Sequence, residues 1–279
     1  MRRLAPALTL GAAVLVAVTG CGAQSTSSLG NVKLAAAEVV QQSAQRAGEV
    51  TSYSADLVLD ANGDRGATKI QGSVVYQSKP QLATDITLDT ITFGGQNVPG
   101  GARAIFTGDT VYVKSELLAR FAGATKPWLK ASLSDLEAKD QTGVKGFLDQ
   151  VQQFDLAGTV KLLTASKDVK AVGTETVGGV ETTHYSGTFP VAEAAQVLDP
   201  ARREQLQQQL SQAKNVKFDL WADAQSLPRK VTLSGSEQQE TFNLTAQFKG
   251  FNEPVTIVAP PAEQVGDLPK NPGNPGGGN

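Results

Sequence analysis

The chain has 279 residues, with 25 basic and 27 acidic side chains and a formal net charge of −2 at pH 7. This weakly acidic balance argues against a nucleic-acid partner, which would require a clear excess of positive charge. Cys21 is the only cysteine, so no intramolecular disulfide forms and the fold must be held together by an apolar core.

The beginning of the chain predicts an export signal followed by a lipid-attachment site. Arg2 and Arg3 precede Leu4–Val18, which has no charged residue, and small residues lead to Cys21. A basic segment, an apolar segment and a short cleavage region are the parts of a secretory signal. The Gly-Cys ending resembles the lipobox of bacterial lipoproteins, in which the thiol receives a diacylglycerol and the chain is cut before it. We therefore expect cleavage after residue 20 and anchoring by Cys21 on the extracytoplasmic face of the cell membrane.

Two alternatives concern the same segment. Leu4–Val18 has 15 residues and is shorter than the ~20 needed to cross a bilayer, so we favour a signal over a membrane span. The arginine pair leaves the choice between Sec and twin-arginine export open. Removal of residues 1–20 would leave 23 basic and 27 acidic side chains, a net charge of −4.

The first half of the remaining chain predicts one helix and then a set of strands. Residues 21–30 are rich in Ser, Gln and Gly and predict a flexible tether. Residues 31–48 have apolar side chains at helical spacing and end at a glycine. From Tyr53 to Leu88 the apolar period changes to two, with turn residues between the runs, which predicts an antiparallel meander. Two shorter strands are expected at 102–106 and 111–114.

The second half predicts helices before and between further strands. Helical stripes are expected over 147–154 and 156–163, and a helical block over 191–215 is broken at Asp199-Pro200. Gly178-Gly179 predicts a two-residue hairpin loop between strands at 169–176 and 180–189, because both loop positions can require positive φ. Strands at 216–223, 229–234 and 240–249 complete about ten antiparallel strands in two blocks. Residues 266–279 are rich in Pro and Gly and predict a disordered tail.

The sequence contains no recognisable catalytic motif. His184 is the only histidine and has neither a cysteine partner nor a Gly-x-Ser-x-Gly elbow to serve, so we interpret it as a strand histidine that is hydrogen-bonded on the solvated face. Gly94–Gly101 is glycine-rich but lacks the Lys-Ser/Thr of a phosphate-binding loop. We expect no enzyme activity, no metal and no cofactor.

Four carboxylates recur at alternating strand positions and leave two interpretations open. They could form a cation-binding ladder, or they could be ordinary acidic side chains on the wet face of the sheet. The residues are Asp56, Asp60, Asp85 and Asp89.

Four segments resemble the LppX/LprG-type envelope lipoproteins, a family similar to the LolA and LolB carriers. The segment Gly123–Leu136 contains a K-P-W-x-K element; the others are Asp168–Tyr185, Asp219–Lys230 and Pro254–Pro261, the last resembling the family's closing strand. The resemblance implies a single α+β domain over residues 31–265. Its fold would be a strongly curved antiparallel sheet, an unclosed half-barrel, with helices packed in the concave mouth and an apolar cavity between sheet and helices that holds acyl chains.

The alternating apolar residues are the candidate walls of that cavity, and they would equally suit an ordinary filled core. They are Leu57, Leu59, Ile70, Val74, Tyr76, Leu82, Ile86, Leu88, Phe106, Phe218, Leu220, Leu244 and Phe248. Two functions remain open: a lipid-anchored carrier of a lipid or glycolipid, or a non-enzymatic interaction module with a filled core that contacts an envelope transporter or signalling protein.

Overall fold

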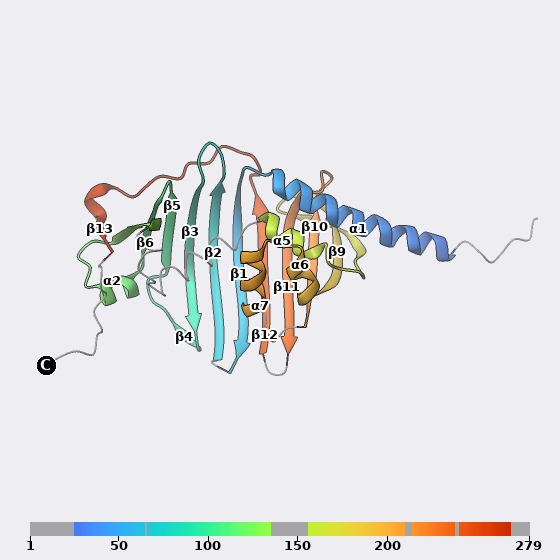
Figure 1. Ribbon diagram of the computed structural model, residues 1–279, viewed down its shortest axis with the longest axis horizontal. Coiled ribbons are helices and arrows are strands. Elements are labelled where there is room, and N and C mark those ends of the chain that lie inside the picture. The colour runs from blue at the N-terminus through green and yellow to red at the C-terminus, as the bar shows by residue number, and fades with distance from the viewer. Residues whose placement is uncertain (1–24, 65, 135–155, 210–213, 238–239, 269–279) are drawn as a thin grey trace, which may run out of the picture.

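The computed structural model describes residues 25–64, 66–134, 156–209, 214–237 and 240–268 (Figure 1). The elements of the first half are α1 (Ser25–Glu49), β1 (Ser52–Gly63), β2 (Gly66–Gln77), β3 (Ala83–Phe93), β4 (Gln96–Asn97), β5 (Ala102–Thr107), β6 (Thr110–Lys114), α2 (Glu116–Ala122) and β7 (Trp128–Ser132). Those of the second half are α5 (Leu156–Leu163), β8 (Lys170–Val177), β9 (Val180–Pro190), α6 (Val191–Gln196), α7 (Pro200–Gln209), β10 (Asn215–Ala222), β11 (Pro228–Glu237), β12 (Glu240–Lys249), a 3-10 turn (Ala262–Gln264) and β13 (Val265–Asp267).

All the described strands belong to one sheet. Their order is β13-β7-β6-β5-β3-β2-β1-β12-β11-β10-β9-β8, with β4 paired to β3. The end strands β13 and β8 are not paired to each other, so the curved sheet stays unclosed, as expected for a half-barrel. The pairs are antiparallel except for the parallel pair of β13 and β7, which makes the sheet mixed.

The two predicted strand blocks are one continuous sheet, because β1 pairs with β12. Their register runs from Ser54 opposite Lys249 to Asn62 opposite Thr241. This pairing joins the meander of the first half to the last three strands of the second half.

Helices α1, α5 and α6 cover one part of one face of the sheet. Figure 1 shows them in front of the neighbouring strands β12, β11, β10 and β9. Val40 of α1, Leu163 of α5 and Ala194 of α6 are buried in one apolar core with Phe218 and Leu220 of β10. This part of the sheet is therefore packed as an ordinary protein interior.

The hairpin between β8 and β9 forms as the sequence predicts. Gly178 and Gly179 have φ values of 57° and 83°. Both lie in the left-handed region, which glycine adopts without the steric cost that a Cβ would add.

Several expected boundaries differ from those observed. Helix α1 begins at Ser25, so residues 25–30, assigned to the tether from composition, are helical. Strand β13 reaches Asp267, so the first two residues assigned to the tail belong to the sheet. The helical stripe predicted over 147–154 lies outside the described residues.

The closing strand is not where the resemblance places it. Pro254–Pro261 has no strand pairing, and its three prolines lack the backbone N–H that a sheet ladder requires. The chain instead closes with β13, where Val265 lies opposite Trp128 of β7.

Within the described part of the chain, no helix combines the length and the apolarity that crossing a membrane requires.

We predict that Phe218→Ala destabilises the fold by about 3–5 kcal/mol, because it leaves a cavity in a closely packed core. The Phe218 ring is fully buried, lies 6.2 Å from the Phe189 ring and packs directly over Gly187. Urea unfolding followed by circular dichroism measures the loss. Phe93→Ala, at a site that is 58% exposed, is the matched control and should change the free energy of unfolding by no more than about 0.5 kcal/mol. Equal losses in the two variants would contradict this description of the core.

Candidate functional site: the apolar face of the sheet

Strand alternation places nearly all the predicted wall residues on one face. Residues directly opposite each other in a ladder project to the same side. Leu59 lies opposite both Ile70 and Leu244, and Val74 lies opposite Ile86. Leu82 is the one outside the strands: it precedes β3 and is 47% exposed, because the chain turns between β2 and β3 before the ladder starts at Ala83.

Six of the predicted wall residues are buried in the core that the sheet shares with α1, α5 and α6. None of the six is more than 8% exposed. They are Leu57, Val74, Ile86, Phe218, Leu220 and Phe248.

The other six strand residues of the set are only half-buried. They are Leu59, Ile70, Tyr76, Leu88, Phe106 and Leu244. The face is therefore divided between a part packed under helices and a part with accessible apolar side chains.

A single row of apolar side chains crosses five strands in the half-buried part. We call it the apolar row: Leu233 (β11), Leu244 (β12), Leu59 (β1), Ile70 (β2) and Ile91 (β3), each opposite the next. All five are half-buried, and Phe218, opposite Leu233, continues the row into the helix-covered core. Leu233 and Ile91 were not among the predicted walls, although they follow the same alternation. With strands about 4.8 Å apart, the row is roughly 19 Å long.

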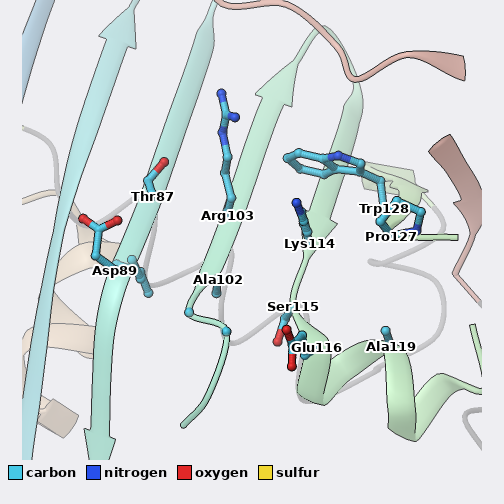
Figure 2. Close-up of a pocket in the computed structure, with 13 residues that line it drawn as sticks. Thr87, Asp89, Ala102, Arg103, Lys114, Ser115, Glu116, Ala119, Pro127 and Trp128 are labelled. Atoms are coloured by element: carbon cyan, nitrogen blue, oxygen red, sulfur yellow. The ribbon is translucent and has the colours of Figure 1, made fainter. Parts of the chain in front are cut away.

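A separate hollow of about 450 Å³ lies on the opposite face (Figure 2). Thr87, Arg103 and Lys114 are cross-strand neighbours along its wall, at positions that alternate with the apolar ones. Trp128, from the K-P-W element, is at one end, and the carboxylates of Asp89 and Glu116 also line the hollow. Charges of both signs line this hollow, so it does not select one class of ligand.

The arginine of the hollow already has partners. The guanidinium of Arg103 donates to both carboxylate oxygens of Asp85 at 2.9 and 2.6 Å, and it lies 5.8 Å from the centre of the Trp128 ring. The hydrogen bond with Asp85 raises the pKa of Arg103 in spite of its partial burial. Lys114 is therefore the cation of the hollow that has no carboxylate partner among the described residues.

Three of the four alternating carboxylates have basic partners, which favours the interpretation that they are ordinary surface acids. Within the described ranges no cluster of three metal-ligating side chains occurs. The ion pairs are Asp56 with Lys249 at 3.0 Å, Asp60 with Lys69 at 3.8 Å and Asp85 with Arg103 at 2.6 Å.

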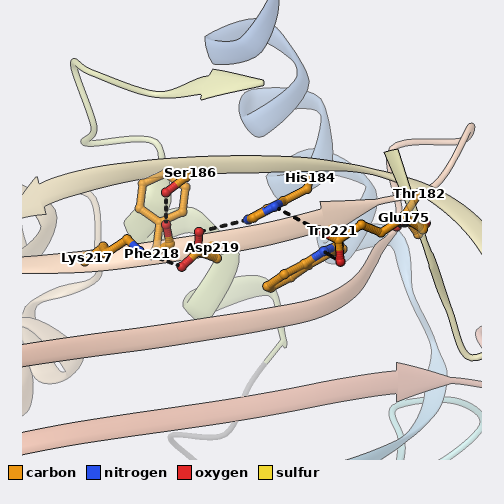
Figure 3. Close-up of polar contacts among 8 residues, drawn as sticks. All are labelled: Glu175, Thr182, His184, Ser186, Lys217, Phe218, Asp219 and Trp221. Atoms are coloured by element: carbon orange, nitrogen blue, oxygen red, sulfur yellow. Dashed lines mark hydrogen bonds and ion pairs between the residues drawn. The ribbon is translucent and has the colours of Figure 1, made fainter. Parts of the chain in front are cut away.

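His184 lies on β9, on the face opposite the apolar row (Figure 3). Its Nε2 is 2.9 Å from Oδ1 of Asp219, so the interpretation of a hydrogen-bonded strand histidine is confirmed. Burial raises the pKa of Asp219, but hydrogen bonds with His184 and Ser186 and the Lys217 ammonium outweigh burial and hold that pKa below its ordinary value of 3.8.

We predict that Asp219→Asn makes stability less sensitive to acid. Because the folded-state pKa of Asp219 is lowered, its stabilising contribution is complete above about pH 4 and is lost as pH falls through the lowered value. The free energy of unfolding, measured in urea between about pH 5 and pH 2, should therefore fall less steeply in the variant. Asp89→Asn removes a carboxylate with no partner among the described residues and is the control. Identical acid dependence in the Asp219→Asn variant and the unmodified chain would refute the prediction.

Comparison with known proteins finds similarity to a family and to several relatives. Residues 155–257 match the model of the LppX_LprAFG lipoprotein family. An uncharacterised 31.2 kDa protein of Streptomyces griseus is 32% identical over 168 residues, which are 56% of this chain and 55% of that protein, so the match spans about half of the relative. A candidate lipoprotein of Streptomyces coelicolor is 26% identical over 286 residues, covering 92% of this chain and 91% of the relative.

Two solved structures of lipoproteins are also similar. LppX of Mycobacterium tuberculosis has 18% identity and a TM-score of 0.44, with 81% of this chain and 99% of that chain covered. LprF of Mycobacterium bovis has 16% identity and a TM-score of 0.49, with 81% and 97% covered. The family match includes the strands from β8 to β12, so this segment of the chain is similar to the LppX_LprAFG lipoproteins.

Proposed function

We propose that this protein is a lipid-anchored carrier of the cell envelope that binds a hydrophobic ligand, a lipid or a glycolipid, on the apolar face of its sheet. The observation that carries the proposal is the apolar row, whose five side chains stay half-buried while Phe218 beside them is fully buried. The match of residues 155–257 to a lipoprotein family supports the envelope location.

The energetics of such a site require no special chemistry. Each methylene that leaves water contributes about 0.8 kcal/mol, and a row of roughly 19 Å offers contact along much of an extended acyl chain. Within the described part of the chain, His184 contacts carboxylates rather than a hydroxyl or thiol nucleophile. We therefore propose binding without catalysis.

A second candidate function is an interaction module that contacts an envelope transporter or signalling protein. The packing of six predicted wall residues against α1, α5 and α6 favours it, because a filled core is what a scaffold needs. The two candidates differ in whether the apolar row meets a lipid.

We predict that Leu244→Gln weakens binding of a fluorescent fatty acid by about tenfold. A glutamine inside the row, between Leu233 and Leu59, loses apolar contact and must leave water without a partner, which costs about 1–2 kcal/mol. Val258→Gln, at a site that is 65% exposed and outside the strands, is the matched control and should bind as the unmodified chain does. Equal affinities for the two variants would overturn the assignment of the row.

Native mass spectrometry of protein purified from its own host tests the same proposal without a probe. A co-purifying lipid would support the carrier. Absence of lipid, together with a protein partner recovered by cross-linking in intact cells, would support the interaction module instead.

We also propose that Cys21 carries the anchor, and we predict that Cys21→Ser moves the protein from the membrane fraction to the soluble fraction. A single acyl chain binds membranes with only about 10⁴ M⁻¹, whereas a diacylglycerol supplies two chains. Cell fractionation followed by immunoblotting measures the shift, and Gln24→Ser, three residues later, should leave the protein in the membrane fraction. A Cys21→Ser variant that is cleaved and still sediments with membranes would show that another element anchors the chain.

A further inference from the structure

A polar cluster occupies the other face of the sheet behind the helix-packed core. His184 of β9, Trp221 of β10 and Lys230 of β11 are consecutive cross-strand neighbours. Glu175 of β8 and Asp219 of β10 lie on either side of the imidazole (Figure 3). We call these five residues the histidine cluster.

Both nitrogens of the imidazole face a carboxylate. Nε2 is 2.9 Å from Oδ1 of Asp219, and Nδ1 is 3.3 Å from Oε1 of Glu175. A carboxylate can only accept, and a neutral imidazole has one donor and one acceptor, whereas the imidazolium has two donors. Both contacts are therefore favourable only when the ring is protonated.

Glu175 links the edge of the sheet to the ring. Its Oε2 accepts a hydrogen bond of 3.0 Å from the indole N–H of Trp221, whose ring stacks on the imidazole with centroids 4.3 Å apart. Glu175 belongs to β8, which is an end strand of the sheet and is exposed along its length except at Val177. This side chain thus adds side-chain contacts to the backbone ladder with β9.

The surrounding charges determine whether the imidazole loses its contact with Asp219 or its contact with Glu175 when the ring loses its proton. The Lys217 ammonium is 3.3 Å from Oδ2 of Asp219, and Lys230 lies 4.2 Å from the Trp221 ring centre. The Asp219 side chain is 16% exposed and keeps a cation beside it, whereas Glu175 is 53% exposed. A neutral ring therefore keeps its donor on Asp219 and turns a lone pair toward Glu175, which can move into water.

We propose that His184 is a proton-controlled latch for the edge strand β8. In the protonated state Glu175 bridges the imidazole and the indole and holds β8 to β9 and β10. In the neutral state Glu175 leaves, Trp221 loses its acceptor and β8 opens more often.

The test follows the ring and the strand in the same sample of the full-length chain in detergent. His184 is the only histidine and Trp221 is one of two tryptophans, so the ring C2 proton reports the charge, and Trp128→Phe assigns the indole N–H signal. As the ring loses its proton, we expect that indole signal to move over the same pH interval. We also expect the exchange protection of the β8 amides, normalised for intrinsic rates, to fall about fivefold, the effect of one lost hydrogen bond on local opening.

Two glutamate variants isolate the latch. Glu175→Gln removes the carboxylate that contacts the imidazolium, and both responses to protonation of the ring should disappear. Glu181→Gln makes the same change on β9 at an exposed position and should keep both responses. Constant β8 protection through the ring titration, or an unchanged response in the Glu175→Gln variant, would overturn the proposal.

Discussion

The pairing of β1 with β12 is the constraint on which the rest of the structure depends. It brings together segments that are far apart in the sequence. Asp56 of β1 and Lys249 of β12, for example, are 193 residues apart and form an ion pair. Its register places Leu59 between Leu244 and Ile70. A slip of one residue would put Asp60 on that face instead, because strand side chains alternate with a period of two. The apolar row is continuous only in the observed register.

Local features of the fold could be predicted because they depend on short-range signals. The Gly178-Gly179 loop specifies a hairpin by itself, and the alternation of Tyr53, Ala55 and Leu57 specifies a strand with one buried face. The joining of two strand blocks into one sheet depends on pairing between distant segments, which no local period reveals. The strands β7 and β13 have five and three residues, too few for a period to show.

The candidate site was predictable in part for the same reason. The period-two alternation of apolar residues correctly assigned Leu59, Ile70 and Leu244 to one face, since side chains alternate between the two faces along each strand. The alternation could not show which of these residues lie under helices, because that depends on where α1, α5 and α6 pack on the sheet. Phe218 and Leu244 have the same sequence pattern, yet one is fully buried and the other is half-buried.

The two faces of β9 and β10 connect the two proposals. Tyr185 and Leu220 lie in the helix-packed core, while their chain neighbours His184 and Trp221 form the histidine cluster behind it. Strand β8 also contacts α1. Opening of β8 would therefore change the contacts that hold α1 against the sheet, where this helix covers part of the apolar face. The apolar row itself lies on β11 to β3, away from that edge, which leaves the ligand contacts and the latch chemically independent. Coupling between the ligand site and the latch would pass through the packing of α1 against the sheet. This coupling would be reciprocal: a ligand that favours the latched state of β8 would also favour the protonated state of His184.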